Sequence, residues 1–431
     1  MTEQKHISHK RQGGNQMEIS SADSPKEILM NARNQIRSIK SDSLDEIEAV
    51  YDSAYEAAKS EKDYGFIMDY AEFLMDRRKL SKGVEITEAF LGSLDDEAAE
   101  RADVLHKLGR LYNVSLDFEK AEKCYMDEID LRREAVDGKL ADACRGLALV
   151  YMNTSAPQKA KPLLKEALDI WQDQMQKNCT PETEYEYAMT CNDMGLLYSE
   201  SKEYKDAAGC FRTAESILTK LIENDKQPKY ESGLASVWNR NALMKERTGD
   251  QGVAEELLSK SLELRRKICN TSSTADRKDD LAASCLNLGN FYQESGMMQE
   301  ATELYLEAQK IYKQLSEKVS STFSPDLAAV CCSLANCYND NGEPEKAEKM
   351  YNKALKTYRS LVKEVSAEAY EPKEAIVLYN MGAYYAKFDP MKASKCFDKA
   401  FKISDKYQYV DPVCKQIFDM LFQFQFTGMM F

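Results

Sequence analysis

The chain has 431 residues, of which 43% are hydrophobic and 30% charged, so a core is expected and disorder throughout is not. Its 72 acidic against 58 basic residues give a formal charge of -14, which argues against nucleic acid and anionic membrane surfaces as partners. No run of about eighteen or more apolar residues predicts a transmembrane helix. Because no signal peptide is visible either, the twelve cysteines are expected to be reduced thiols of a cytoplasmic protein.

The N-terminal part of the chain predicts a polar tail followed by two helices. Residues 1–23 are polar and are expected to be disordered. Ser24 and Glu27 have the spacing of a capping box, with Pro25 at the first helical position, and Ser43 with Glu46 repeats that spacing. Two helices near 25–40 and 44–61 are therefore predicted, forming a capping unit over 24–63.

The rest of the chain is dominated by an internal repeat. A small residue follows an apolar one at spacings of 38, 39, 47, 47, 47, 46 and 47, and an alanine or glycine recurs twelve residues after each one, or eleven in the last repeat. We call these small residues the anchors: Ala71, Gly109, Ala148, Gly195, Ala242, Gly289, Ala335 and Gly382. Because two helices approach closely only where small residues meet, each repeat is expected to be an antiparallel helix pair. About eight such pairs over residues 64–407 predict an all-α solenoid.

Apolar columns flank each anchor and set the helix lengths. Three residues after the anchor, six of the eight repeats carry tyrosine: Tyr112, Tyr151, Tyr198, Tyr292, Tyr338 and Tyr385. The period of 46 to 47 exceeds that of a standard 34-residue helix-pair repeat, and part of the excess lengthens the second helix. Two helices of roughly sixteen to twenty-two residues per repeat are predicted.

Two segments carry a family resemblance. Residues 286–315 and 334–361 strongly resemble tetratricopeptide repeats, most of all the long-helix variety of kinesin light chains. The resemblance implies a right-handed superhelix whose first helices line the concave face. It also implies a role in binding peptides or proteins, because that is how such arrays work, although the fold by itself does not name a partner.

The C-terminal segment, residues 408–431, is unusually apolar. From Ile417 to Phe431 it has a single charge, on Asp419. It is interpreted as a capping segment packed on the last repeat. Two alternatives stay open, an exposed tail for homodimerisation or partner docking, and a truncated final repeat.

Few residues suggest chemistry. Four cysteines lie four residues before an anchor, in the column of large apolar residues, and are interpreted as core: Cys144, Cys191, Cys285 and Cys331. With three histidines, no CxxC pair and no phosphate-binding glycine loop, neither a catalytic triad nor a zinc site is predicted. We therefore expect no catalytic residue, no metal and no cofactor.

The remaining signal is a set of amides on the first helices, at positions that the resemblance places on the concave face. The predicted peptide-binding residues are Asn192, Asn239, Asn287, Asn290, Asn336, Asn339 and Asn380, together with Arg240 and Arg247. Each amide offers two donors and an acceptor, which suits the backbone of an extended peptide. The sequence thus predicts a non-catalytic scaffold or adaptor that binds a protein or peptide ligand in this groove. The alternative is a peptide-sensing regulatory protein whose superhelix changes pitch on binding.

Overall fold

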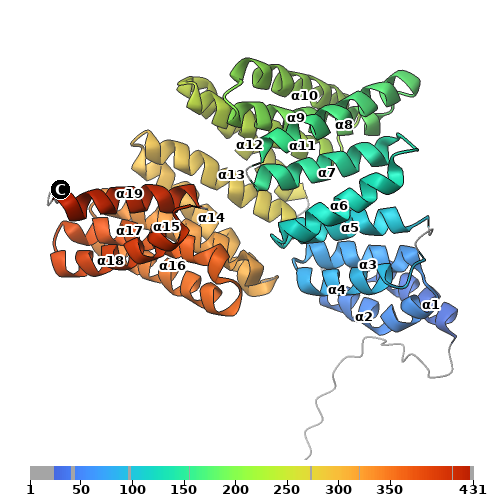
Figure 1. The fold of residues 1–431 in the computed structure, drawn as a ribbon, viewed down its shortest axis with the longest axis horizontal. Coiled ribbons are helices and arrows are strands. Elements are labelled where there is room, and N and C mark those ends of the chain that lie inside the picture. The colour runs from blue at the N-terminus through green and yellow to red at the C-terminus, as the bar shows by residue number, and fades with distance from the viewer. Residues whose placement is uncertain are drawn as a thin grey trace, which may run out of the picture.

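The computed structural model describes residues 24–39, 44–95, 99–154, 156–271, 274–319, 321–409 and 411–427. Within these ranges the chain forms nineteen α-helices and one 3-10 helix, and no strand. The fold is therefore an all-α solenoid, as predicted (Figure 1). The expected disordered tail, Ser43 and the last four residues lie outside the described residues.

The helices follow one another with short connections along the whole described chain. The N-terminal helices are α1 (Pro25–Ser38), α2 (Leu44–Ser60), α3 (Tyr64–Asp76), α4 (Leu80–Leu91), α5 (Arg101–Val114) and α6 (Phe118–Arg132). The middle helices are α7 (Gly138–Asn153), α8 (Pro157–Lys177), α9 (Pro181–Glu200), α10 (Tyr204–Asn224), α11 (Pro228–Arg247) and α12 (Gln251–Thr271). The C-terminal helices are α13 (Ala275–Glu294), α14 (Met298–Lys318), η1 (Ser321–Phe323), α15 (Ser324–Asp340), α16 (Pro344–Glu364), α17 (Ala367–Ala386), α18 (Pro390–Tyr407) and α19 (Pro412–Thr427).

Helix pairs stack in chain order. Each odd-numbered helix from α3 to α17 packs on the helix after it, and each even-numbered helix packs on the first helix of the next pair. The stack curves from blue through green and yellow to red in Figure 1. Its buried apolar side chains fall into successive clusters along the array, as expected when each unit packs mainly on its neighbours.

The predicted helix length holds for most of the array but not for its beginning. Helices α7 to α18 have 16 to 21 residues. Helices α3 to α6 have only 12 to 15 residues, so the prediction of sixteen or more is wrong there. The reason lies in the anchor spacing, because 38 or 39 residues leave less chain for two helices than 47 do.

The glycine anchors leave room for an aromatic ring rather than for another small residue. A Cβ added to Gly289 would lie 2.8 Å from the ring of Tyr305, and one added to Gly195 would lie 2.7 Å from Phe211. Both rings stand sixteen residues after their anchor, one turn beyond the alanine that we expected opposite it. Ala301 is fully buried, but it is the Tyr305 ring that lies against Gly289. This corrects the detail of the predicted contact while keeping its register.

Both ends of the array carry extra helices. Ser24 caps α1 as predicted, because the Glu27 backbone N–H donates to Ser24 Oγ over 3.4 Å and Glu27 Oε2 accepts from the Ser24 N–H over 2.9 Å. At the other end α19 packs on α17 and α18. There Ile417 is buried and the Phe418 ring stacks on Phe401 with 5.0 Å between centroids. Met420, on the outer side of α19, is exposed. The predicted division of the chain into the segments 24–63, 64–407 and 408–431 stays a prediction.

The cysteine column is part of the core, as predicted. Cys144, Cys285 and Cys331 are fully buried and Cys191 is 4% exposed. Burial raises the pKa of the Cys144, Cys191 and Cys285 thiols to about 12. In contrast, Cys179 is exposed in the turn after α8.

Candidate peptide-binding site

The first helices form a continuous surface along part of the array. Helix α7 packs against α9, α9 against α11, α13 against α15, and α15 against α17. We call this surface the first-helix surface. All nine predicted binding residues lie on its helices, but many of their polar groups already have partners within the protein.

Two of the predicted amides are drawn into contacts between neighbouring first helices. Asn192 is fully buried, and its Nδ2 lies 3.5 Å from Ser236 Oγ. One repeat later, Asn239 Nδ2 donates to Ser284 Oγ over 3.2 Å. The packing of α9 on α11 covers the Asn192 amide, and the predicted role of Asn192 in peptide binding stays a prediction.

Two other amides accept hydrogen bonds from tyrosines that come from the second helix. Tyr305 Oη donates to Asn290 Oδ1 over 2.6 Å, and Tyr351 Oη donates to Asn336 Oδ1 over 2.6 Å. Each asparagine directly follows its anchor, and the Tyr305 ring lies against the anchor Gly289. The carbonyl oxygen of both amides is thus occupied, while their NH₂ groups are not used by these bonds.

The remaining three amides lie on α13, α15 and α17. Asn339 Oδ1 accepts from Lys387 Nζ over 3.1 Å, and Asn380 Nδ2 lies 3.5 Å from Cys332 Sγ. Asn287 is half-buried on α13. The amides therefore do not form one uniform ladder, because their partners differ from repeat to repeat.

The two predicted arginines have different roles in the structure. Arg240 is paired, because its NH1 lies 2.5 Å from Asp193 Oδ1, and the other oxygen of Asp193 accepts from Arg145 Nε over 2.6 Å. Burial by itself would raise the pKa of Asp193, but the charges of Arg145 and Arg240 bring it below its ordinary value. Arg240 thus connects α11 to α9 through Asp193, and its predicted role in peptide binding stays a prediction. Arg247 is exposed at the end of α11.

A cavity lies between the first helices α15 and α17, where two of the predicted amides meet. Its volume is about 450 Å³, within the range of roughly 300–1,000 Å³ that ligand pockets occupy. It is lined by Pro325, Asp326, Ala329, Cys332, Ser333 and Asn336 of α15, by Tyr358 of α16, and by Tyr370, Lys373, Ile376, Val377 and Asn380 of α17. The wall is mainly apolar and carries one acidic and one basic side chain.

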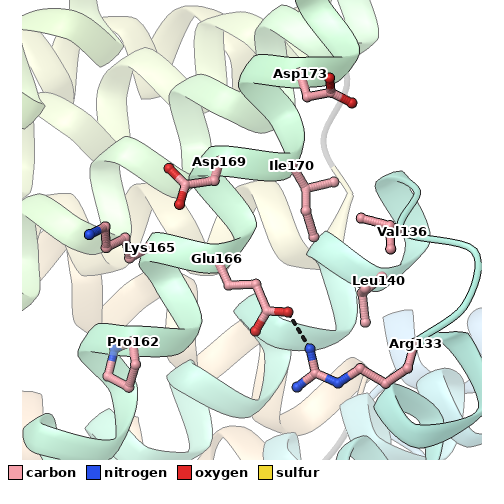
Figure 2. Close-up of a pocket in the computed structure, with 9 residues that line it drawn as sticks. All are labelled: Arg133, Val136, Leu140, Pro162, Lys165, Glu166, Asp169, Ile170 and Asp173. Atoms are coloured by element: carbon pink, nitrogen blue, oxygen red, sulfur yellow. Dashed lines mark hydrogen bonds and ion pairs between the residues drawn. The ribbon is translucent and has the colours of Figure 1, made fainter.

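A second cavity, of about 560 Å³, lies between the turn after α6 and helix α8 (Figure 2). Val136, Leu140 and Ile170 provide its apolar part, and five charged side chains surround them. Figure 2 shows Arg133 reaching across to pair with Glu166, so two of the five charged side chains neutralise each other. None of the predicted binding residues lines this cavity, and we take the α15–α17 cavity as the candidate site.

Sequence reasoning missed the cavity's apolar wall and the Arg145–Asp193–Arg240 clamp. The signal for the clamp was present, because opposite charges stand 47 and 48 residues apart in almost the same column. The wall gave no such signal, because Tyr358, Tyr370 and Ile376 look like ordinary helix-packing residues.

No group of three or more potential metal-ligating side chains gathers anywhere in the described ranges. In the same part of the chain, no helix is both long and apolar enough to cross a membrane.

The comparisons with known proteins agree on the fold. The tetratricopeptide repeat family model matches residues 280–360, from α13 into α16. A signal transduction ATPase with a tetratricopeptide repeat sensor from Pyrococcus horikoshii is similar with a TM-score of 0.56 and 14% identity, covering 94% of this chain and 56% of that one. No curated protein matches the chain.

Two further solved structures are similar at TM-scores below 0.5 and carry no argument of their own. BtubC from P. vanneervenii matches at 0.43 and 19% identity, over 57% of this chain and 92% of that one. A Rap protein complexed with competence and sporulation factor matches at 0.47 and 15% identity, over 84% and 94%. The family match over residues 280–360 identifies tetratricopeptide repeats in that segment, and the likeness over nearly the whole chain shows that the chain has the fold of a tetratricopeptide repeat solenoid.

Proposed function

We propose that the chain is a non-catalytic interaction protein that binds an extended peptide segment of a partner protein in the α15–α17 cavity. The observation that carries this proposal is the cavity's lining, in which an apolar wall is flanked by the amides of Asn336 and Asn380. Small-molecule and peptide sites commonly combine a mainly apolar wall with a few polar groups that fix orientation.

The two amides complement each other as partners for a peptide backbone. Asn336 Oδ1 is taken by Tyr351, so its NH₂ group is the part that can donate to a peptide carbonyl. Asn380 directs its Nδ2 toward Cys332, so its Oδ1 is the part that can accept from a peptide N–H. One donor and one acceptor on adjacent helices match the alternating groups of an extended chain.

The wall between the amides favours an apolar anchor residue of the peptide. Ala329, Ile376 and Val377 contribute aliphatic surface, and Tyr358 stacks with Tyr370 at 6.5 Å between centroids. Lys373 and Asp326 contribute charges of opposite sign, so the lining has no net charge that would select a strongly charged side chain. An aliphatic or aromatic anchor flanked by hydrogen-bonded backbone is therefore the expected ligand.

The test fills the cavity without touching the core. Linear peptides are selected from a displayed random library on the wild-type chain, and their affinity is measured by fluorescence anisotropy. Ala329 is an exposed lining residue on α15, so Ala329→Trp should block the cavity and weaken binding at least tenfold. Ala386→Trp, at an exposed position on α17 outside the cavity lining, is the matched control and should bind normally. Equal affinity of both variants would refute the proposed site.

A second candidate function is a regulatory sensor whose superhelix changes pitch when a peptide binds. One observation favours it, an ion pair between the turn after α3 and helix α13, whose residues stand 201 positions apart. Such a contact depends on superhelical pitch, so a change in pitch would make or break it.

A further inference from the structure

A side-chain contact joins the beginning of the array to its later part. Arg78, in the turn between α3 and α4, donates to Asp279 Oδ2 on α13 over 2.7 Å. The same guanidinium lies over the Phe323 ring of η1, 5.4 Å from its centroid. Contacts between neighbouring repeats, such as Arg145 with Asp193, join residues only 48 apart. The Arg78 contact therefore spans several repeats.

The environment of this contact makes it more than a solvated surface pair. The side chains of Arg78 and Asp279 are 31% and 22% exposed, and Phe323 is 2% exposed. A partly desolvated guanidinium held between a carboxylate and an aromatic face is attracted by both. The three residues come from three separate elements, the α3–α4 turn, α13 and η1. The contact thus fixes the position of these elements relative to one another.

The contact adjoins the candidate peptide site. Phe323 immediately precedes α15, and three residues later Asp326 lines the α15–α17 cavity. Burial, and after it the charge of Asp279, raises the pKa of Asp326 to about 6, while the charge of Arg78 opposes that rise. The electrostatic influence of Arg78 therefore extends to a cavity-lining carboxyl group.

We propose that the contacts of Arg78 hold the superhelix closed by keeping the α3–α4 turn against α13 and η1. We call these contacts the latch. By holding η1 in place, the latch also fixes the Asp326 end of the peptide cavity. The link between latch and ligand rests on the proposed function. Because binding and conformation are thermodynamically linked, a peptide that prefers the closed cavity stabilises the latch, and an intact latch strengthens peptide binding by the same factor. Arg78 acts here as a positioning residue, since it does not line the cavity itself.

The first test needs no ligand. Arg78→Glu places like charges opposite each other, so small-angle X-ray scattering of the full chain should show a larger radius of gyration and maximum dimension than the wild type. Arg78→Glu combined with Asp279→Lys should restore the compact dimensions. Lys202→Ala is the control, because Lys202 occupies the equivalent position in the turn between α9 and α10 and also has a positive φ, 63° against 55° for Arg78, and it should scatter like the wild type. Circular dichroism checks that helix content is unchanged in every variant.

The second test measures the coupling with a fluorescently labelled peptide selected on the wild-type chain. Arg78→Glu should weaken its binding at least fivefold, and the charge-reversed double variant should recover most of the affinity. Unchanged scattering of Arg78→Glu would overturn the latch, and expanded dimensions with unchanged affinity would overturn its coupling to the site. Failure of the proposed function looks different, because Ala329→Trp would then bind the peptide as tightly as the wild type.

Discussion

The hydrogen bond from Tyr351 to Asn336 makes a sharp prediction about stability. Tyr351 is 1% exposed, and its hydroxyl lies 2.6 Å from Asn336 Oδ1. Asn336→Ala removes the acceptor and leaves the hydroxyl unpaired in the interface between α15 and α16. Leaving a buried polar group without its partner costs about 1–3 kcal/mol, more than the roughly 0.5–1.5 kcal/mol that a typical hydrogen bond contributes. We therefore expect Asn336→Ala to destabilise its repeat by about 1–3 kcal/mol.

The chain contains its own control for this effect. Tyr305 donates to Asn290 over 2.6 Å but also lies 2.9 Å from Gln293 Oε1, so Asn290→Ala leaves it a second acceptor. That variant should lose less than about 1 kcal/mol. A third variant, Tyr351→Phe combined with Asn336→Ala, removes both partners and should be more stable than Asn336→Ala with Tyr351 intact.

The assay must be local as well as global, because stability in a repeat array is distributed among units. Thermal unfolding followed by circular dichroism gives the overall ranking of the variants. Amide hydrogen exchange should show the largest loss of protection in α15 and α16 for Asn336→Ala. Equal midpoints for Asn336→Ala and Asn290→Ala, or a double variant less stable than Asn336→Ala, would refute the reasoning.

Three further predictions concern packing, thiols and pH. Gly289→Leu should lower the midpoint by the equivalent of about 1–3 kcal/mol or more, because the Tyr305 ring occupies the space of any side chain there, and an unchanged midpoint would contradict the register. A thiol reagent under native conditions should modify exposed Cys179 fastest and leave Cys144 unmodified until unfolding, so that early labelling of Cys144 counts against the core assignment. Burial raises the pKa of Glu186 to about 7 despite its pairing with Arg145, so its stabilising contribution is present at low pH and lost as pH rises through about 7. The midpoint should accordingly fall between about pH 4.5 and 7 more steeply in the wild type than in Glu186→Gln, and parallel curves for the two would show that Glu186 is not responsible.

The sequence was sufficient for the repeat architecture because the signal is local and recurs. Small anchors at intervals of 46 to 47 residues predict helix pairs, and Gly289 lies where its register requires, against a helix of the same pair. Tyr351 and Asn336 stand sixteen and one residues after their anchor, but their hydrogen bond was not predicted from the sequence. Periodicity tells which residues share a face, however, and not whether an acceptor such as Asn336 Oδ1 is already occupied.

The features that the sequence did not predict depend on geometry that accumulates over many repeats. Asn192 belongs to the predicted groove column, yet the approach of α9 to α11 covers it. The contact of Arg78 with Asp279 requires the summed rotation of several helix pairs, and no local pattern encodes that sum. The α15–α17 cavity likewise arises from the space that two neighbouring first helices leave between them. The residue columns of the repeat do not reveal the size of that space.

Site-specific photo-crosslinking tests the central claim most directly. A benzophenone amino acid replaces Lys373, an exposed residue at the α15–α17 cavity, or Lys165, an exposed residue at the cavity beside α8. Each variant is irradiated with a peptide selected on the wild-type chain, and the products are mapped by mass spectrometry. The account predicts a peptide adduct at position 373, suppressed by Ala329→Trp, and none at position 165. An adduct only at position 165, or one at 373 that Ala329→Trp does not reduce, would contradict it.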